Sequence, residues 1–238
     1  MRRNILKKVM AICLCFAFIF NSAIVSLAKE NDNSNIINEK YLTEEPSETF
    51  IDFYSSFFEN KEIFQIFDYD GNDITKSFYD ATYKFYKNND YQGLKNYVLN
   101  NNVLGGCEER TENIKETRGF KTDSVHKRYF YNVNKHPAAG ELEYYINGTY
   151  SWDVRTGKIA SHTGGSVQIT RCNFGALWSH STDNMTVRAT VSNDGYSITF
   201  YGSFHLVVTL GISIGKFPVG WKVDCGSYSG SATATGHT

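Results

Sequence analysis

Residues 203–215 of this 238-residue chain read SFHLVVTLGISIG, the most regular stretch of its sequence. Every second residue from Phe204 to Ile214 is large and apolar, and the residues between them are small or mostly polar. Successive side chains of a strand point to opposite faces, so this period of two predicts a long strand with one buried face. Such strands are typical of antiparallel sheets that pack one face on a core.

The same alternation is also typical of a strand that crosses a membrane, with lipid on one side and water on the other. A spanning strand needs about 9–11 residues, so the length fits. A partner strand over residues 185–191 offers Val187, Ala189 and Val191 on one face, but it is short and contains Arg188. We therefore prefer a sandwich strand and keep a membrane-inserting hairpin of a pore-forming protein as an alternative.

Turn signals separate short stretches of strand character throughout the second half of the chain. Asn193-Asp194-Gly195 is the strongest of these signals, because glycine adopts the positive φ that tight hairpin turns require. Six or more short strands at this spacing predict an antiparallel β-sandwich or barrel-like domain over residues 122–238. The expected strands span residues 128–133, 141–152, 166–172, 185–191, 197–214, 220–225 and 227–235.

Residues 41–104 have the periodicity of helices instead. Aromatic residues from Phe50 to Phe58 recur at i, i+3, i+4, i+7 and i+8, which places them on one face of a helix expected over residues 46–60. The whole chain is therefore predicted to be α+β, with a short aromatic-rich helical region before the β domain. Further expected elements are a strand over residues 63–67, a helix capped by Thr75, and a helix with Tyr91, Leu94, Tyr97 and Val98.

Two segments are predicted to lie outside these folded regions. Residues 105–121 begin with two glycines and continue as a charged stretch with few large apolar residues, so we expect a linker. Residues 29–40 are polar and rich in asparagine, so we expect a disordered leader.

Residues 1–28 have the three parts of a secretory signal peptide. Basic residues precede an apolar run over residues 9–20, and the small residues Ser26 and Ala28 fit a signal peptidase site, so we expect cleavage after Ala28. The apolar run is too short to serve as a stable membrane anchor. The protein is therefore expected to be secreted, extracellular or associated with the cell envelope. Its richness in Asn, Lys, Ile and Tyr suggests a bacterial source.

Removal of the signal peptide takes four of the 24 basic residues and none of the 25 acidic ones, which leaves a net charge of −5. A mildly acidic chain without basic clusters is not expected to bind nucleic acid. Three cysteines remain, which permits one disulfide plus a free thiol, three free thiols, or pairing between chains. Because Cys172 and Cys225 both lie in the strand-rich half, we predict a disulfide between them and a free Cys107.

Residues 68–73 read DYDGND, and carboxylates at alternating positions can converge on a calcium ion. An EF-hand loop has glycine at its sixth position and glutamate at its twelfth, whereas here Gly71 is fourth and the twelfth residue is Tyr79. We therefore expect a turn that leads into a helix, and no metal site.

A thiol enzyme needs a base beside its cysteine. Cys107 follows two glycines, and Asp224-Cys225-Gly226 resembles the nucleophile segment of the NlpC/P60 family of cell-wall peptidases. The histidines of that family follow its cysteine, whereas only His237 follows Cys225, which speaks against the resemblance. The candidate bases for either cysteine are His126, His136, His162, His180, His205 and His237, and none has a recognisable peptidase context.

Glu141 and Glu143 lie on one face of an expected strand, roughly 7 Å apart. Two carboxylates of a glycosidase lie about 5–10 Å apart, so this spacing fits. A solvated strand face with aromatic residues packed into the sheet is the simpler interpretation. The aromatic residues that would suit carbohydrate stacking are Tyr144, Tyr145, Tyr150 and Trp152.

The sequence contains no serine-hydrolase, zinc-protease or phosphate-loop motif, so we assign no catalytic, cofactor or metal residues. We predict a non-enzymatic binding or cell-envelope-associated protein, with a cell-wall polymer or carbohydrate as its partner. The first alternative is a cell-wall or glycan hydrolase that uses Glu141 with Glu143, or Cys107 with a histidine. The second is the pore-forming protein.

Overall fold

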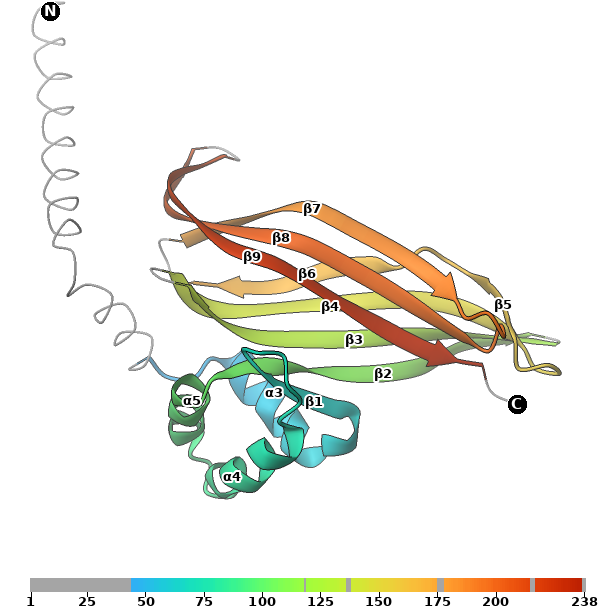
Figure 1. Ribbon diagram of the computed structural model, residues 1–238, viewed down its shortest axis with the longest axis horizontal. Helices are drawn as coiled ribbons and strands as arrows, with labels where there is room; N and C mark the ends of the chain where they lie inside the picture. Colours follow the sequence, from blue (N-terminus) through green and yellow to red (C-terminus); the bar gives the residue numbers. More distant parts are fainter. Residues whose placement is uncertain (1–43, 118, 136–137, 175–177, 215–216, 237–238) are drawn as a thin grey trace, which may run out of the picture. The chain divides into compact units, whose positions relative to one another are not determined.

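The computed structural model describes residues 44–117, 119–135, 138–174, 178–214 and 217–236, which belong to one compact unit (Figure 1). The signal peptide with its cleavage after Ala28 and the leader 29–40 lie outside the described residues. The unit has three α-helices followed by two antiparallel sheets, which are not closed into a barrel. The predicted α+β class and the sandwich are therefore confirmed. Among the described residues, every helix is too short or too polar to cross a membrane.

The helices begin and end close to their predicted positions. Ser47 caps the first helix, because its hydroxyl accepts a hydrogen bond of 3.0 Å from the backbone N–H of Phe50. The cap expected at Thr75 is wrong, because Thr75 is the first helical residue and its backbone N–H donates to Asp73 Oδ1 at 2.9 Å. The helical elements are α3 (Glu48–Glu59), the 3-10 turn η1 (Lys61–Ile63), α4 (Thr75–Lys87) and α5 (Tyr91–Asn100).

The first sheet has six strands in the order β1-β2-β3-β4-β5, with β6 also paired to β4, and the second has three in the order β7-β8-β9 (Figure 1). The first sheet contains β1 (Phe64–Asp68), β2 (Val103–Thr117), β3 (Phe120–Lys135), β4 (Ala138–Asp153), β5 (Ile159–His162) and β6 (Ser166–Asn173). The second contains β7 (Trp178–Val191), β8 (Ser197–Ile214) and β9 (Phe217–Thr235).

Residues 105–121, expected to be a linker, form most of β2 and the start of β3. β2 pairs with β1 on one side and with β3 on the other, so the helical region contributes a strand to the same sheet as the β region. The charges of this segment are compatible with a strand because they pair across it, as Glu109 does with Lys127 at 2.9 Å.

The alternation of residues 203–215 decides which face of β8 is buried. Phe204, Leu206 and Val208 are at most 1% exposed and pack against the first sheet, whereas His205 and Val207 between them are partly exposed. Two glycines allow the sheets to pack closely against each other. A Cβ on Gly148 would lie 2.3 Å from the ring of Phe200 of β8, and one on Gly202 would meet β6.

The edge of β9 is tied to the first sheet by tyrosine hydroxyls. The Tyr129 hydroxyl donates to the carbonyl of Ser231 at 2.9 Å and accepts from its N–H at 2.8 Å. The Tyr144 hydroxyl donates to the carbonyl of Ser229 at 3.1 Å, and the two tyrosine rings stack with centroids 4.8 Å apart. These bonds satisfy backbone groups that a free edge would otherwise offer to another strand.

The helices cover the opposite face of the first sheet with an aromatic core. This core holds the aromatic stripe of α3, which was predicted, together with Phe78 of α4. It also includes Phe130 of β3, whose ring stacks on Phe53 with centroids 5.0 Å apart. Because Phe130 lies in the middle of the sheet, the helices and the strands share one continuous packed structure.

Candidate functional site

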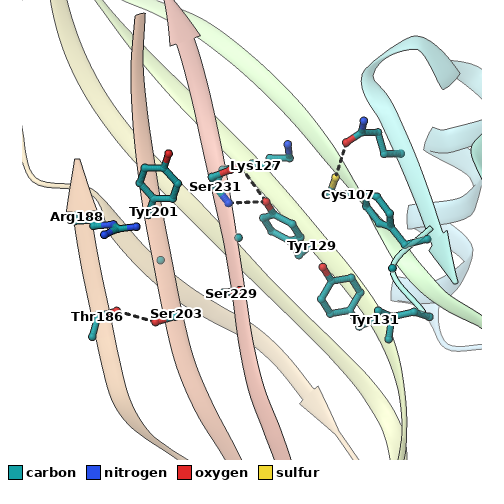
Figure 2. Close-up of a pocket in the computed structure, with 16 residues that line it drawn as sticks. Cys107, Lys127, Tyr129, Tyr131, Thr186, Arg188, Tyr201, Ser203, Ser229 and Ser231 are labelled. Carbon is teal, nitrogen blue, oxygen red and sulfur yellow. Dashed lines mark hydrogen bonds between the residues drawn. The ribbon is translucent and has the colours of Figure 1, made fainter. Parts of the chain in front are cut away.

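A groove of about 880 Å³ passes over β9 and is lined by strands of both sheets (Figure 2). On one side of β9 lie Arg188 and Tyr201, on the outer face of the second sheet. On the other side lie Tyr129, Tyr131 and Cys107, where the first sheet extends beyond the edge of β9. We call this cavity the β9 groove.

The floor of the β9 groove consists of cross-strand rows. The ladder aligns Arg188 of β7 with Tyr201 of β8, and Tyr201 with Ser231 of β9. The next row aligns Thr186, Ser203 and Ser229, and the Thr186 and Ser203 hydroxyls lie 2.7 Å apart. Adjacent rows on one face of the sheet are about 7 Å apart.

The lining of the β9 groove is rich in hydroxyl groups and carries two cations. The first cation is Arg188, whose guanidinium lies over the ring of Tyr201, 4.7 Å from its centroid. The second is Lys127, which forms an ion pair of 2.9 Å with Glu109, a residue that does not line the groove. Among the described residues that line the groove there is neither a carboxylate nor a histidine. Burial raises the pKa of Tyr131 to about 12, so its phenol stays neutral and can donate a hydrogen bond. The groove can therefore hold a polar ligand but contains no acid–base pair.

Cys107 forms part of the groove wall but is not activated. Its side chain is buried, and this burial raises the pKa of its thiol to about 11. Its Sγ contacts Gln65 Oε1 at 3.8 Å. His126, the nearest histidine candidate along β3, lies on the opposite face of the sheet and bonds to Asn147 and Ser124 at 2.9 Å. Among the described residues, no hydrogen bond joins Cys107 to a histidine, and the candidates His136 and His237 lie outside the described residues.

Glu141 and Glu143 lie on one face of β4, as expected, but that face is covered by the helical region. Glu141 is 2% exposed and accepts a hydrogen bond of 2.6 Å from Ser47, and burial raises its pKa. Glu143 is 8% exposed, pairs with Arg128 at 2.6 Å and accepts from the Thr170 hydroxyl at 2.7 Å. Both carboxylates therefore hold elements of the fold together.

The aromatic residues near these carboxylates face different ways. Tyr144, Tyr150 and Trp152 are buried between the two sheets, where a sugar cannot reach them. Tyr145 lies on the helix-covered face, beside Arg128, and is half-buried. Their packing agrees with the structural interpretation of this segment.

The acidic stretch 68–73 is a turn whose carboxylates bind their own backbone. Asp68 Oδ1 accepts from the N–H groups of Asp70 at 3.0 Å and Asn72 at 2.8 Å, and the bonds from Asn72 lower its pKa. Asp73 Oδ1 binds the start of α4. Across the described residues, no three potential metal-ligating side chains gather at one point.

The structure contains no disulfide among the described cysteines, so the expected Cys172–Cys225 disulfide is not formed in it. The two cysteines nevertheless pack in the same core between the sheets. Burial, and secondly the proximity of Cys225, raise the pKa of Cys172 to about 12. These surroundings predict thiols of low reactivity.

We expect iodoacetamide to label Cys107 and Cys172 of the native protein at pH 8 roughly 100-fold more slowly than the unfolded protein, because a raised pKa leaves few thiolates. Mass spectrometry of the alkylated peptides gives both rates, and rapid native labelling of Cys107 would contradict the burial. Labelling of Cys107 alone after unfolding without reductant would show that exported protein carries the Cys172–Cys225 disulfide.

A group of three hydrogen-bonded side chains on β8 and β9, which was not predicted from the sequence, lies next to the β9 groove. His205 of β8 bonds through Nδ1 to Ser227 Oγ and through Nε2 to Asp224 Oδ1, both at 3.1 Å. Serine, histidine and aspartate also form the catalytic triads of hydrolases. Here, however, the Asp224 side chain is 70% exposed and accepts a hydrogen bond of 2.7 Å from the backbone N–H of Gly226. The group therefore lacks an enclosed base and a free donor for an oxyanion. No cross-strand contact of this kind can be recognised before the register of β8 and β9 is known.

In comparisons with known proteins, no family model, no curated protein and no solved structure matches the chain. The geometry of the β9 groove is therefore the basis for its function.

Proposed function

We propose that this protein is a non-enzymatic binding protein of the bacterial cell envelope, which holds a polyhydroxylated polymer such as a cell-wall glycan in the β9 groove. The observation that carries the proposal is the lining of the groove, in which hydroxyl groups and a tyrosine ring lie in rows without a carboxylate or a histidine. Hydroxyl groups can both donate to and accept from the hydroxyls of a sugar.

The geometry of the groove favours binding over catalysis. Ligand sites combine apolar or aromatic surface with a small number of placed polar groups, as Tyr201 does with Ser203 and Ser231 here. Acid–base catalysis would require a titratable pair, and the one titratable thiol in the wall has a raised pKa. Phe204, Leu206 and Val208, on the apolar face of β8 that was considered above for membrane insertion, pack in the core between the sheets.

The direct test is co-sedimentation of the full protein with insoluble cell walls and purified polysaccharides. We expect binding to at least one polymer, and Tyr201→Ala should weaken it roughly 3- to 10-fold because an aromatic stacking surface is lost. Tyr196→Ala is the matched control, since Tyr196 is 40% exposed, close to the 37% of Tyr201, but lies outside the groove. The control variant should bind like the wild type.

Three outcomes would contradict this proposal. Binding to no polymer would remove it. Release of soluble fragments from a bound polymer would favour the hydrolase, and leakage of dye-loaded vesicles would favour the pore-forming protein.

A further inference from the structure

We infer that Arg188 is the anchor for an acidic group of the ligand, so that the β9 groove takes an anionic polyol, a polymer that carries carboxylate or phosphate groups. This inference rests on the proposed function and specifies its ligand. Its basis is the position of one arginine among hydroxyl groups, without an acidic partner of its own.

Arg188 lies on the edge strand β7, and its surroundings differ from those of Arg110 and Arg128 in the first sheet. Arg128 pairs with Asp52 and Glu143, and Arg110 pairs with Glu108, so these cations are neutralised within the fold. In contrast, no carboxylate of the described residues lies within ion-pair distance of Arg188, although the chain has more acidic than basic residues. A charge left unpaired beside a groove is available to a ligand.

The Tyr201 ring orients this arginine. Its guanidinium lies over the ring, 4.7 Å from the centroid, and Figure 2 shows it directed from β7 toward Tyr201. Stacking on the flat ring leaves the edge of the guanidinium free, and this edge presents the paired N–H groups that bind a carboxylate or phosphate in bidentate fashion. A lysine at this position would keep the charge but lose that geometry.

The neighbouring side chains complete a site for oxygen-rich anions. Ser231 lies in the same cross-strand row as Arg188, and Thr186 and Ser203 form the next row. Hydroxyl donors beside a guanidinium bind anionic oxygens that the arginine does not reach. Lys127 on the far side of β9 is a second cation, but Glu109 already pairs with it at 2.9 Å. Arg188 is therefore the principal recognition residue.

The experiment measures binding of the full protein to three probes: dextran, which is neutral, polygalacturonate, which carries carboxylates, and poly(glycerol phosphate). We expect an anionic probe to bind at least 10-fold more tightly than dextran, with an affinity that falls as salt is added. The anionic probe that binds more tightly identifies the acidic group.

Arg188→Gln should weaken binding of that anionic probe roughly 10- to 100-fold, as expected for a charge-assisted bidentate contact, and Arg188→Lys should restore part of the loss. Arg155→Gln is the matched control, because Arg155 is an exposed arginine outside the groove. Arg188 is exposed, so circular dichroism of the variants should match the wild type.

The two proposals fail in different ways. If dextran binds as tightly as the anionic probes and Arg188→Gln has no effect, the inference about Arg188 is wrong while the binding function stands. If neither these probes nor cell walls bind, both are wrong.

Discussion

Replacing Arg128 with alanine should lower the free energy of unfolding by about 3–5 kcal/mol. The Arg128 side chain is 11% exposed and lies between helix α3 and the sheet, where it pairs with Asp52 at 2.8 Å and Glu143 at 2.6 Å. Its guanidinium also covers the ring of Phe53, 5.5 Å from the centroid. The substitution leaves the carboxylate of Glu143 buried without its cation, and an uncompensated buried charge is the main source of the loss.

Denaturant titration of wild type and variant measures this change. Lys76→Ala is the control, because Lys76 pairs with Asp80 at 2.8 Å but their side chains are 92% and 59% exposed. Removal of that surface pair should change stability by less than about 0.5 kcal/mol. An equally small effect of Arg128→Ala would show that the Arg128 pairs contribute nothing. The double variant Arg128→Met/Glu143→Leu should recover much of the lost stability, since it removes both charges.

Local periodicity predicted the parts of the fold that depend on neighbouring residues. The aromatic stripe of α3 and the alternation of β8 each describe one buried face, so a period of 3.6 or 2 is enough to identify the element. β2 was missed because the charges of residues 105–121 suggested solvent, whereas cross-strand pairs such as Glu109 with Lys127 accommodate them in a sheet.

The candidate site could not be predicted in the same way, because six strands contribute to it. Arg188 and Tyr201 are adjacent only through the register of β7 and β8, and Tyr129 reaches them over the edge of β9. One local signal existed. Arg188 stands among Val187, Ala189 and Val191 in the sequence but on the opposite face of the strand, and a charged side chain on that exposed face is available for recognition.

Phe130→Ala should cost about 3–5 kcal/mol and lower the melting temperature by roughly 6–20 °C. Phe130 is fully buried and its ring stacks on Phe53, with Tyr54 a further 6.1 Å contact, so the truncation leaves a cavity beneath α3. Phe120→Ala on the same strand is the control, because Phe120 is 43% exposed and should matter little. Thermal denaturation followed by circular dichroism measures both changes.

The same experiment decides whether the helices and the sheets unfold together. All three tryptophans, Trp152, Trp178 and Trp221, lie on strands, so their fluorescence reports the sheets, whereas circular dichroism at 222 nm also reports the helices. Because Phe130 packs the helices onto the first sheet, we expect both signals to change at one midpoint in the wild type and at one lower midpoint in Phe130→Ala. A helical transition that precedes the fluorescence change in the wild type would mean that the helical region is a separate domain, joined to the sheet only by β1.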